Sequence, residues 1–150
     1  MEVRVERSDI AQYPASAVIV NLFEGVAQPG GGTGAVDRAL DGAIARVIQD
    51  GDCRGKENEF TLIHTLGKIP APRVLVAGLG KPESFSLEKV RSVAAGAARY
   101  LRRLRCETIA SITHGAGIAG LDPEACAQAV AEGAVLGLYT FRRHKKPNED

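Results

Sequence analysis

Two glycine-rich segments are the parts of this chain whose composition best suits ligand chemistry. The first is QPGGGTG, residues 28–34, and the second is THGAGIAG, residues 113–120. Glycine permits positive φ and close backbone approach, and free N–H groups at the start of a helix can hold an anion. Neither segment has the spacing of a dinucleotide fingerprint or a P-loop, because no Gly-Lys-Ser/Thr follows. Each segment lies between a predicted strand and a predicted helix, so the two could meet at the carboxyl edge of one sheet.

These two loops supply the candidate binding residues. They are Asn21, Gly30, Gly31, Gly32 and Thr33 from the first region, and Gly115, Gly117, Ile118 and Gly120 from the second. His114, beside the second loop, is a further candidate for a ligand contact. The alternative is that both loops only turn the chain, because glycine marks turns more often than binding sites.

No catalytic residue and no metal ligand is predicted. His64, His114 and His144 belong to separate segments, and His64 fits a core histidine in an apolar strand. Ser111 and Thr113 have no evident base in the sequence, which leaves a nucleophilic triad without support. The acidic side chains, among them Asp37, Asp41 and Glu88, fit solvated helix faces or helix starts. Cys126, in an alanine-rich segment, fits a small core residue.

An arginine-rich run stands out from this otherwise neutral chain. Arg99, Arg102, Arg103 and Arg105 fall largely opposite the apolar face formed by Ala97, Leu101 and Leu104. A solvated helix face is the simpler interpretation, and a patch for phosphate or for a partner is the alternative.

Composition restricts the class of protein. A chain of 150 residues with 45% hydrophobic and 25% charged residues has the composition of one globular domain. The formal net charge of +1 makes nucleic acid an improbable partner. The charged N-terminus lacks a signal-peptide core, and no apolar run reaches the ~20 residues that span a bilayer. The three cysteines are far apart in the sequence and form no Cys-x-x-Cys pair. We therefore expect a cytoplasmic protein with reduced thiols and no membrane partner.

Hydrophobic periodicity predicts the elements that position the loops. Strands are expected around Val3–Val5 and over residues 17–23, 60–65, 74–79 and 108–113. Helices are expected over 36–48, from a Ser86 cap to Leu104, and from Asp122-Pro123 to about Phe141. Alternating strands and helices predict an α/β fold, a three-layer αβα sandwich with a mixed, mostly parallel sheet. The predicted domain covers residues 1–143, followed by a polar tail at 144–150.

The chain resembles the N-terminal domain of the leucyl aminopeptidase family over nearly its whole length. The resemblance rests on VLVAGLGK at 74–81 and AEGAVLGLYTF at 131–141, with ALDGAI at 39–44 and LEKVR at 87–91. It implies a macrodomain-like domain that is non-catalytic and serves assembly or regulation of an oligomeric metallopeptidase. Zinc or manganese is then expected only in the catalytic domain, because the family's metal-binding signature has no match in this chain. The implied partners are that catalytic domain, in cis or in trans, and further copies of the chain in a homo-oligomer.

A second resemblance, to ADP-ribose-binding macrodomains, implies a different function. It rests on Asn21, the glycines at 30–32, and the segment 117–120 before Pro123. Glu24 stands where that group has an asparagine that contacts ribose, and Ala119 replaces the usual aromatic residue. The alternative function is an ADP-ribose or nucleotide-binding module, which requires an open cleft between the two loops. A third possibility, an interaction domain without a ligand, requires an exposed apolar patch.

Overall fold

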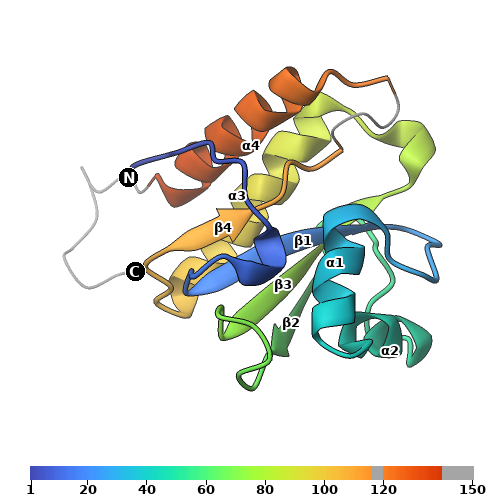
Figure 1. Cartoon of the computed structure of the whole chain (residues 1–150). Helices are drawn as coiled ribbons and strands as arrows, with labels where there is room; N and C mark the ends of the chain where they lie inside the picture. Colours follow the sequence, from blue (N-terminus) through green and yellow to red (C-terminus); the bar gives the residue numbers. More distant parts are fainter. Residues whose placement is uncertain (116–119, 140–150) are drawn as a thin grey trace.

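The centre of the molecule is a four-stranded mixed sheet. The computed structural model describes residues 1–115 and 120–139, and within them the strand order is β2–β3–β1–β4 (Figure 1). The strands are β1 (Ala17–Phe23), β2 (Phe60–His64), β3 (Arg73–Gly80) and β4 (Ile109–Ser111). β1 runs parallel to both β3 and β4, and β2 is antiparallel to β3. The predicted mixed, mostly parallel sheet is confirmed.

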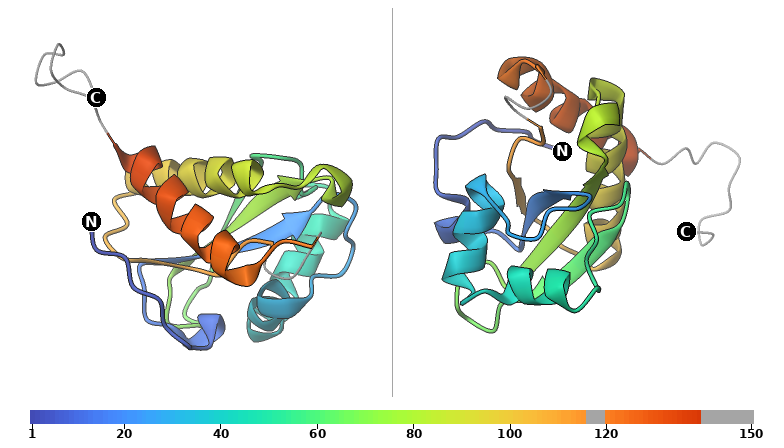
Figure 2. Two further views of the ribbon diagram at one scale, coloured as in Figure 1. Left: turned by 90° about the horizontal axis from the view of Figure 1, so that it is seen from above. Right: turned by 90° about the vertical axis from the view of Figure 1, so that its right-hand side faces the viewer.

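Helices cover both faces of this sheet. α1 (Gly31–Ala39) and α2 (Ala43–Gln49) lie on one face, and α3 (Leu87–Arg103) and α4 (Pro123–Leu138) lie side by side on the other (Figure 2). Two short 3-10 turns, Ile10–Gln12 and Pro82–Ser84, lie before β1 and after β3. The arrangement is the predicted three-layer αβα sandwich.

The molecule has two hydrophobic cores, one on each face of the sheet, because side chains alternate between the two faces along each strand. Along β1, Val18, Val20 and Leu22 pack toward α1 and α2, whereas Ala17, Ile19 and Phe23 pack toward α3. β3 alternates in the same way. Side chains on successive strand residues point to opposite faces, so a strand covered on both sides is apolar throughout. Cys126 is fully buried, as predicted for a small core residue.

Glycines set the close packing of α4 on α3. A Cβ atom added at Gly137 would lie 2.6 Å from the Cα of Ala95, so only glycine allows the two helices to approach this closely. Arg91 Nε donates to Glu132 Oε2 at 2.8 Å across the same interface. Both predicted helix starts are confirmed, because Ser86 Oγ accepts from Lys89 N and Asp122 Oδ2 accepts from Ala125 N.

The helix predicted over residues 36–48 is wrong in one respect, because it is two helices. Asp41 and Gly42 have φ values of 56° and 83°, which turns the chain between α1 and α2. Asp37 is buried rather than solvated, and its Oδ1 accepts from Ile44 N at 2.8 Å and from Ala45 N at 3.0 Å. The carboxylate therefore holds the free amides at the start of α2.

Three further predictions need correction. Val3 and Val5 lie outside any strand, and Val5 is 89% exposed. His64 is exposed, because it ends the edge strand β2 instead of lying in the core. α4 ends at Leu138, before the predicted end near Phe141, since Tyr139 is already extended. The predicted strands over 60–65 and 108–113 are present but shorter.

The proposed domain boundary at residue 143 and the polar tail at 144–150 lie outside the described residues, as does His144. Among the residues that the structure describes, no helix is both long and apolar enough to cross a membrane.

Candidate functional site

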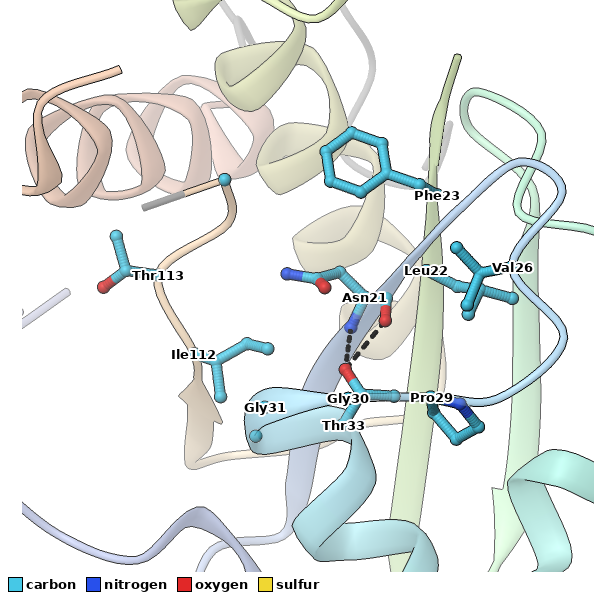
Figure 3. A pocket seen from close by; sticks show the side chains of 12 residues that line it. Asn21, Leu22, Phe23, Val26, Pro29, Gly30, Gly31, Thr33, Ile112 and Thr113 are labelled. Atoms are coloured by element: carbon cyan, nitrogen blue, oxygen red, sulfur yellow. Dashed lines mark hydrogen bonds between the residues drawn. The ribbon is translucent and has the colours of Figure 1, made fainter. Parts of the chain in front are cut away.

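A cavity of about 390 Å³ lies at the carboxyl end of β1, between the loop before α1 and the loop after β4 (Figure 3). Six of the nine residues predicted from the glycine loops line it, namely Asn21, Gly30, Gly31, Gly32, Thr33 and Gly115. The structure thus brings the two loops together at the predicted edge of the sheet. A cavity therefore lies between the described parts of the two loops, and residues 116–119 of the second loop lie outside the described residues.

The cavity opens where β1 and β4 separate. Their pairing ends at Ile19 and Ser111, and the last bond between them runs from Ile112 N to Ile19 O at 3.2 Å. Beyond that point Ile112 and Thr113 form one wall of the cavity, while β1 continues to Phe23 (Figure 3). A parallel strand that loses its neighbour exposes backbone groups that need new partners.

The hydroxyl of Thr33 satisfies those backbone groups. Thr33 Oγ1 donates to Asn21 O at 2.7 Å and accepts from Asn21 N at 3.2 Å, as the dashed lines in Figure 3 mark. Thr33 is 3% exposed, so the bonds are shielded from water. The Thr33 side chain, in the first turn of α1, therefore replaces the β4 backbone as the hydrogen-bond partner of β1. It also holds the start of the helix against β1.

The side chain of Asn21 reaches the second loop. Its Nδ2 donates to His114 Nδ1 at 3.0 Å, which places the neutral histidine's proton on Nε2. His114 Nε2 lies 3.4 Å from Ser111 Oγ, and Ser111 Oγ donates to Ile112 O at 2.8 Å. This chain of bonds links both loops through β1.

His114 is a core residue and does not line the cavity. It is fully buried, and desolvation by burial lowers its pKa from 6.5 to about 4. Protonation of His114 Nδ1 would also place one N–H donor opposite another, the side-chain amide of Asn21, and the hydrogen bond between them would be lost. Both ring nitrogens of His114 lie within hydrogen-bond distance of described neighbours, and a ligand contact by His114 stays a prediction.

The glycines of the site divide into two kinds. Among the described atoms, nothing lies within 4 Å of a Cβ added at Gly30 or Gly31, so these two residues present bare backbone to the cavity. Gly32 and Gly115 are instead required by packing: an added Cβ would lie 2.9 Å from Ile112 Cγ2 at Gly32, and 2.8 Å from Phe85 Cζ at Gly115. Gly115 also has a φ of 76°, which disfavours any other residue.

Electrostatics at the cavity favour an anion over a cation. α1 begins at Gly31, and no side chain in the described part of the chain caps it. The amides of its first turn are therefore available at the positive end of the helix. Glu24 is half-buried and lies outside the cavity lining, so it neither fills the cleft nor faces a ligand there.

Aromatic packing closes the back of the cavity. The Phe23 ring lines the cavity and meets the Phe85 ring edge to face, with centroids 5.0 Å apart and planes at 81°. Phe85 in turn packs on Gly115. No pattern in the sequence predicts this contact, because the three residues come from three separate segments.

Three predicted site residues have a different outcome. Gly117 and Ile118 lie outside the described residues. Gly120 is described, is exposed with a φ of 72°, and does not line the cavity. No sequence pattern predicts that Ile112 lines the cavity or that Ser111 lies beside His114, because both roles depend on where β4 ends.

Comparisons with known proteins identify the relatives of this chain. A sequence model of the N-terminal domain of the cytosol aminopeptidase family matches residues 19–148. A probable cytosol aminopeptidase from Alkaliphilus metalliredigens is 35% identical over 145 residues, which are 97% of this chain and 29% of the relative. One from Geobacter sulfurreducens is 32% identical with the same coverage. The chain thus spans about three-tenths of the length of the curated relatives that it matches.

Solved structures share the fold. A variant of tomato leucine aminopeptidase superposes with a TM-score of 0.70 at 21% identity, covering 94% of this chain and 29% of that chain. The macrodomain of Mycobacterium tuberculosis DarG superposes with a TM-score of 0.68 at 16% identity, covering 87% of this chain and 88% of that one. At these identities the likeness shows a macrodomain-like fold.

Proposed function

We infer that this chain, which belongs to the cytosol aminopeptidase family and corresponds to its N-terminal domain, serves a leucyl aminopeptidase-type metallopeptidase in assembly or regulation rather than in catalysis. The observation that carries this proposal is the family match over residues 19–148, set against the 29% of each relative that the chain covers. The partner is the family's catalytic domain, joined in cis or bound in trans, and the assembly is a homo-oligomer in the cytoplasm.

The metal of such an enzyme belongs to the catalytic domain in this proposal. Among residues 1–115 and 120–139, no group of three or more His, Cys, Asp or Glu side chains could hold an ion. By resemblance to the family, the zinc or manganese that polarises a peptide carbonyl and activates water would be held by residues of the catalytic domain. No step of hydrolysis is assigned to side chains of this chain.

The end of α4 supports the role in assembly. Val135 and Leu136 near the end of α4 and Tyr139 just after it are 49%, 68% and 71% exposed, which places three large exposed side chains within five residues. Exposed apolar surface of this kind is typical of a contact with another domain or subunit.

The test combines this chain with the part of the Alkaliphilus metalliredigens relative that follows its own N-terminal domain. We expect a complex on size-exclusion chromatography with light scattering, and faster hydrolysis of leucine p-nitroanilide in the presence of Mn²⁺. Leu136→Asp should weaken the complex, whereas Leu66→Asp, at another exposed leucine, should not. Absence of a complex at micromolar concentrations of both proteins would contradict assembly in trans. The same substitutions in the full-length relative would then test assembly in cis.

A second function, binding of an ADP-ribose-like nucleotide, is favoured by one specific observation. The cavity lies between the two glycine loops and is bordered by the uncapped start of α1. The candidate contacts are the backbone amides at Gly30, Gly31 and Gly32, because the Thr33 hydroxyl and the side-chain nitrogen of Asn21 already bond to other groups of the protein.

Calorimetry with ADP-ribose tests this second function. Gly30→Leu is the blocking variant, since Gly30 has a φ of −120° that leucine adopts and its side chain would enter open space in the cavity. Ala27→Leu, exposed in the same loop and outside the lining, is the matched control. Saturable binding that is lost only in Gly30→Leu supports the nucleotide function. Equal binding by both variants, or none by the unaltered chain, contradicts it.

A further inference from the structure

A second pocket, of about 290 Å³, lies between the outer side of α3 and the chain that enters β2. Its lining includes Arg99, Tyr100 and Arg103 from α3, and Asn58 and Phe60 from the other segment. The two sets of lining residues have no member in common, so this pocket is separate from the cavity at the glycine loops. Neither function proposed above makes use of it.

Two guanidinium groups border this pocket without an acidic partner. Arg99 and Arg103 are one helical turn apart on α3, both are exposed, and no ion pair among the described residues includes either of them. Like charges at this spacing repel each other, and a bound anion would relieve that repulsion. The segment 92–105 also contains Arg102 and Arg105 and not one Asp or Glu.

The nearest acidic side chains on the segment that enters β2 are already engaged. Glu57 Oε2 lies 3.3 Å from Lys89 Nζ, and Glu59 Oε1 accepts from the backbone amide of Arg54 at 2.6 Å. Neither of these carboxylates lines the pocket, whose only charged lining groups among the described residues are the two guanidinium groups.

An aromatic surface lies beside the two arginines. The rings of Phe60 and Tyr100 have centroids 6.0 Å apart with planes tilted by 47°. Gly96 makes this position of Phe60 possible, because an added Cβ would lie 2.7 Å from the ring atom Cζ. The absence of a side chain at Gly96 therefore determines the depth of the pocket.

Polar groups complete the lining. Asn58 Nδ2 donates to Ser92 Oγ at 3.2 Å, which leaves the serine hydroxyl proton available to an acceptor. Asn58 holds a φ of 60°, a left-handed conformation that asparagine tolerates better than most residues, and this places its side chain toward α3.

We propose that this pocket binds a small molecule in which an anionic group is attached to a planar ring. Arg99 and Arg103 hold the anion, because guanidinium groups donate paired hydrogen bonds to phosphate and carboxylate. The ring packs on Phe60 and Tyr100, where aromatic contact adds apolar burial. The Ser92 hydroxyl supplies one further donor.

Phenyl phosphate is the probe for this site, and inorganic phosphate and benzoate are its comparisons. Isothermal titration of the purified chain should show saturable binding of phenyl phosphate that is tighter than binding of inorganic phosphate. Arg99→Gln and Arg103→Gln should each weaken it about tenfold, the effect of losing one charge-assisted contact. Arg105→Gln removes the same charge outside the pocket and should keep the affinity within about twofold. Benzoate that binds with the same arginine dependence supports a carboxylate as the anion, and failure of benzoate alone supports phosphate.

Three results would overturn the proposal. The first is the lack of saturable binding of both phenyl phosphate and benzoate at about 10 mM, a concentration that detects even millimolar affinity. The second is an equal loss of affinity in Arg105→Gln, which would mean a general positive field instead of a site. The third is equal affinity for phosphate and phenyl phosphate, since the aromatic surface would then contribute nothing. A Gly96→Ala variant, which displaces Phe60, provides an independent check on that last point.

Discussion

The side-chain amide of Asn21 donates a 3.0 Å hydrogen bond to Nδ1 of the buried His114, and these two residues are 93 positions apart in the chain. The backbone of the same asparagine is bonded to Thr33 at the start of α1. One residue of β1 therefore fixes the positions of both loops that border the larger cavity. Its side-chain nitrogen and its backbone groups are used within the protein, so they position the loops.

Stability should depend on His114 between pH 6.5 and 4. Burial lowers its pKa to about 4, so the unfolded chain takes up this proton first as the pH falls. The neutral His114 contributes about 3 kcal/mol to the free energy of unfolding. This contribution is complete above pH 6.5, decreases as the pH falls, and is gone below about pH 4. Urea unfolding at a series of pH values measures the slope. We expect His114→Gln to reduce it and His64→Gln, at an exposed histidine, to leave it unchanged.

Removal of the Thr33 hydroxyl should destabilise the fold. Thr33→Val keeps the shape of the side chain but leaves the amide and carbonyl of Asn21 without their partner. We expect a loss of about 2 kcal/mol in the free energy of unfolding, the cost of buried unsatisfied groups. Thr33→Ser keeps the hydroxyl and should lose much less. Equal loss in both variants would mean that packing of the methyl group is what matters.

Asp37 should stabilise the start of α2 through its oxygen and not through its charge. Oδ1 accepts from two backbone amides, and an asparagine offers the same acceptor atom. Asp37→Ala is expected to lose about 1–2 kcal/mol in thermal or urea unfolding, as for loss of a helix cap. Asp37→Asn should lose well under half as much, and a full loss in asparagine would point to the charge instead.

The glycine at 137 should be essential to the contact between α3 and α4. A larger side chain there would meet Ala95 and force the helices apart, which costs about 2 kcal/mol by overpacking. Gly137→Val is expected to lower the unfolding midpoint in urea, even though valine favours a helix more than glycine does. Val135→Ala on the exposed side of the same helix is the control, with a change of at most about 0.5 kcal/mol.

Gly30→Asp should separate stability from ligand binding. Aspartate caps helices better than glycine and its charge suits the start of α1, so we expect a gain of a few tenths of a kcal/mol. The same carboxylate would occupy the anion's place at the cavity and repel it. Differential scanning calorimetry and ADP-ribose titration of one sample measure both effects. A loss of stability would show that the loop needs glycine at this position for another reason.

Signals that act over a few residues predicted the elements well. Ser86, Asp122 and Pro123 marked helix starts correctly, because a cap depends on bonds within one turn. The apolar runs of β1 and β3 identified the central strands, because a strand that is buried on both faces is apolar at nearly every position. The convergence of the two glycine loops followed from the parallel sheet.

Features that depend on distant contacts could not be predicted in this way. The apolar period continues from Val36 to Ile48 across the turn at Gly42, so it gives no sign that two helices meet there. Val3 and Val5 alternate with charged residues as a strand would, but neither belongs to a strand. The partners of His114 are known only once β1 and the second loop are placed together.

The three-residue length of β4 has a consequence for how this scaffold can be diversified. Because β4 stops while β1 continues, the width of the gap between them is fixed by strand geometry, and Thr33 completes the sheet from outside it. Exchanging the residues at 28–30 would then change the selectivity of the opening without altering the strands and the helix that border it. The sheet and α1 thus form a rigid frame, and the loop before α1 is the part that can vary.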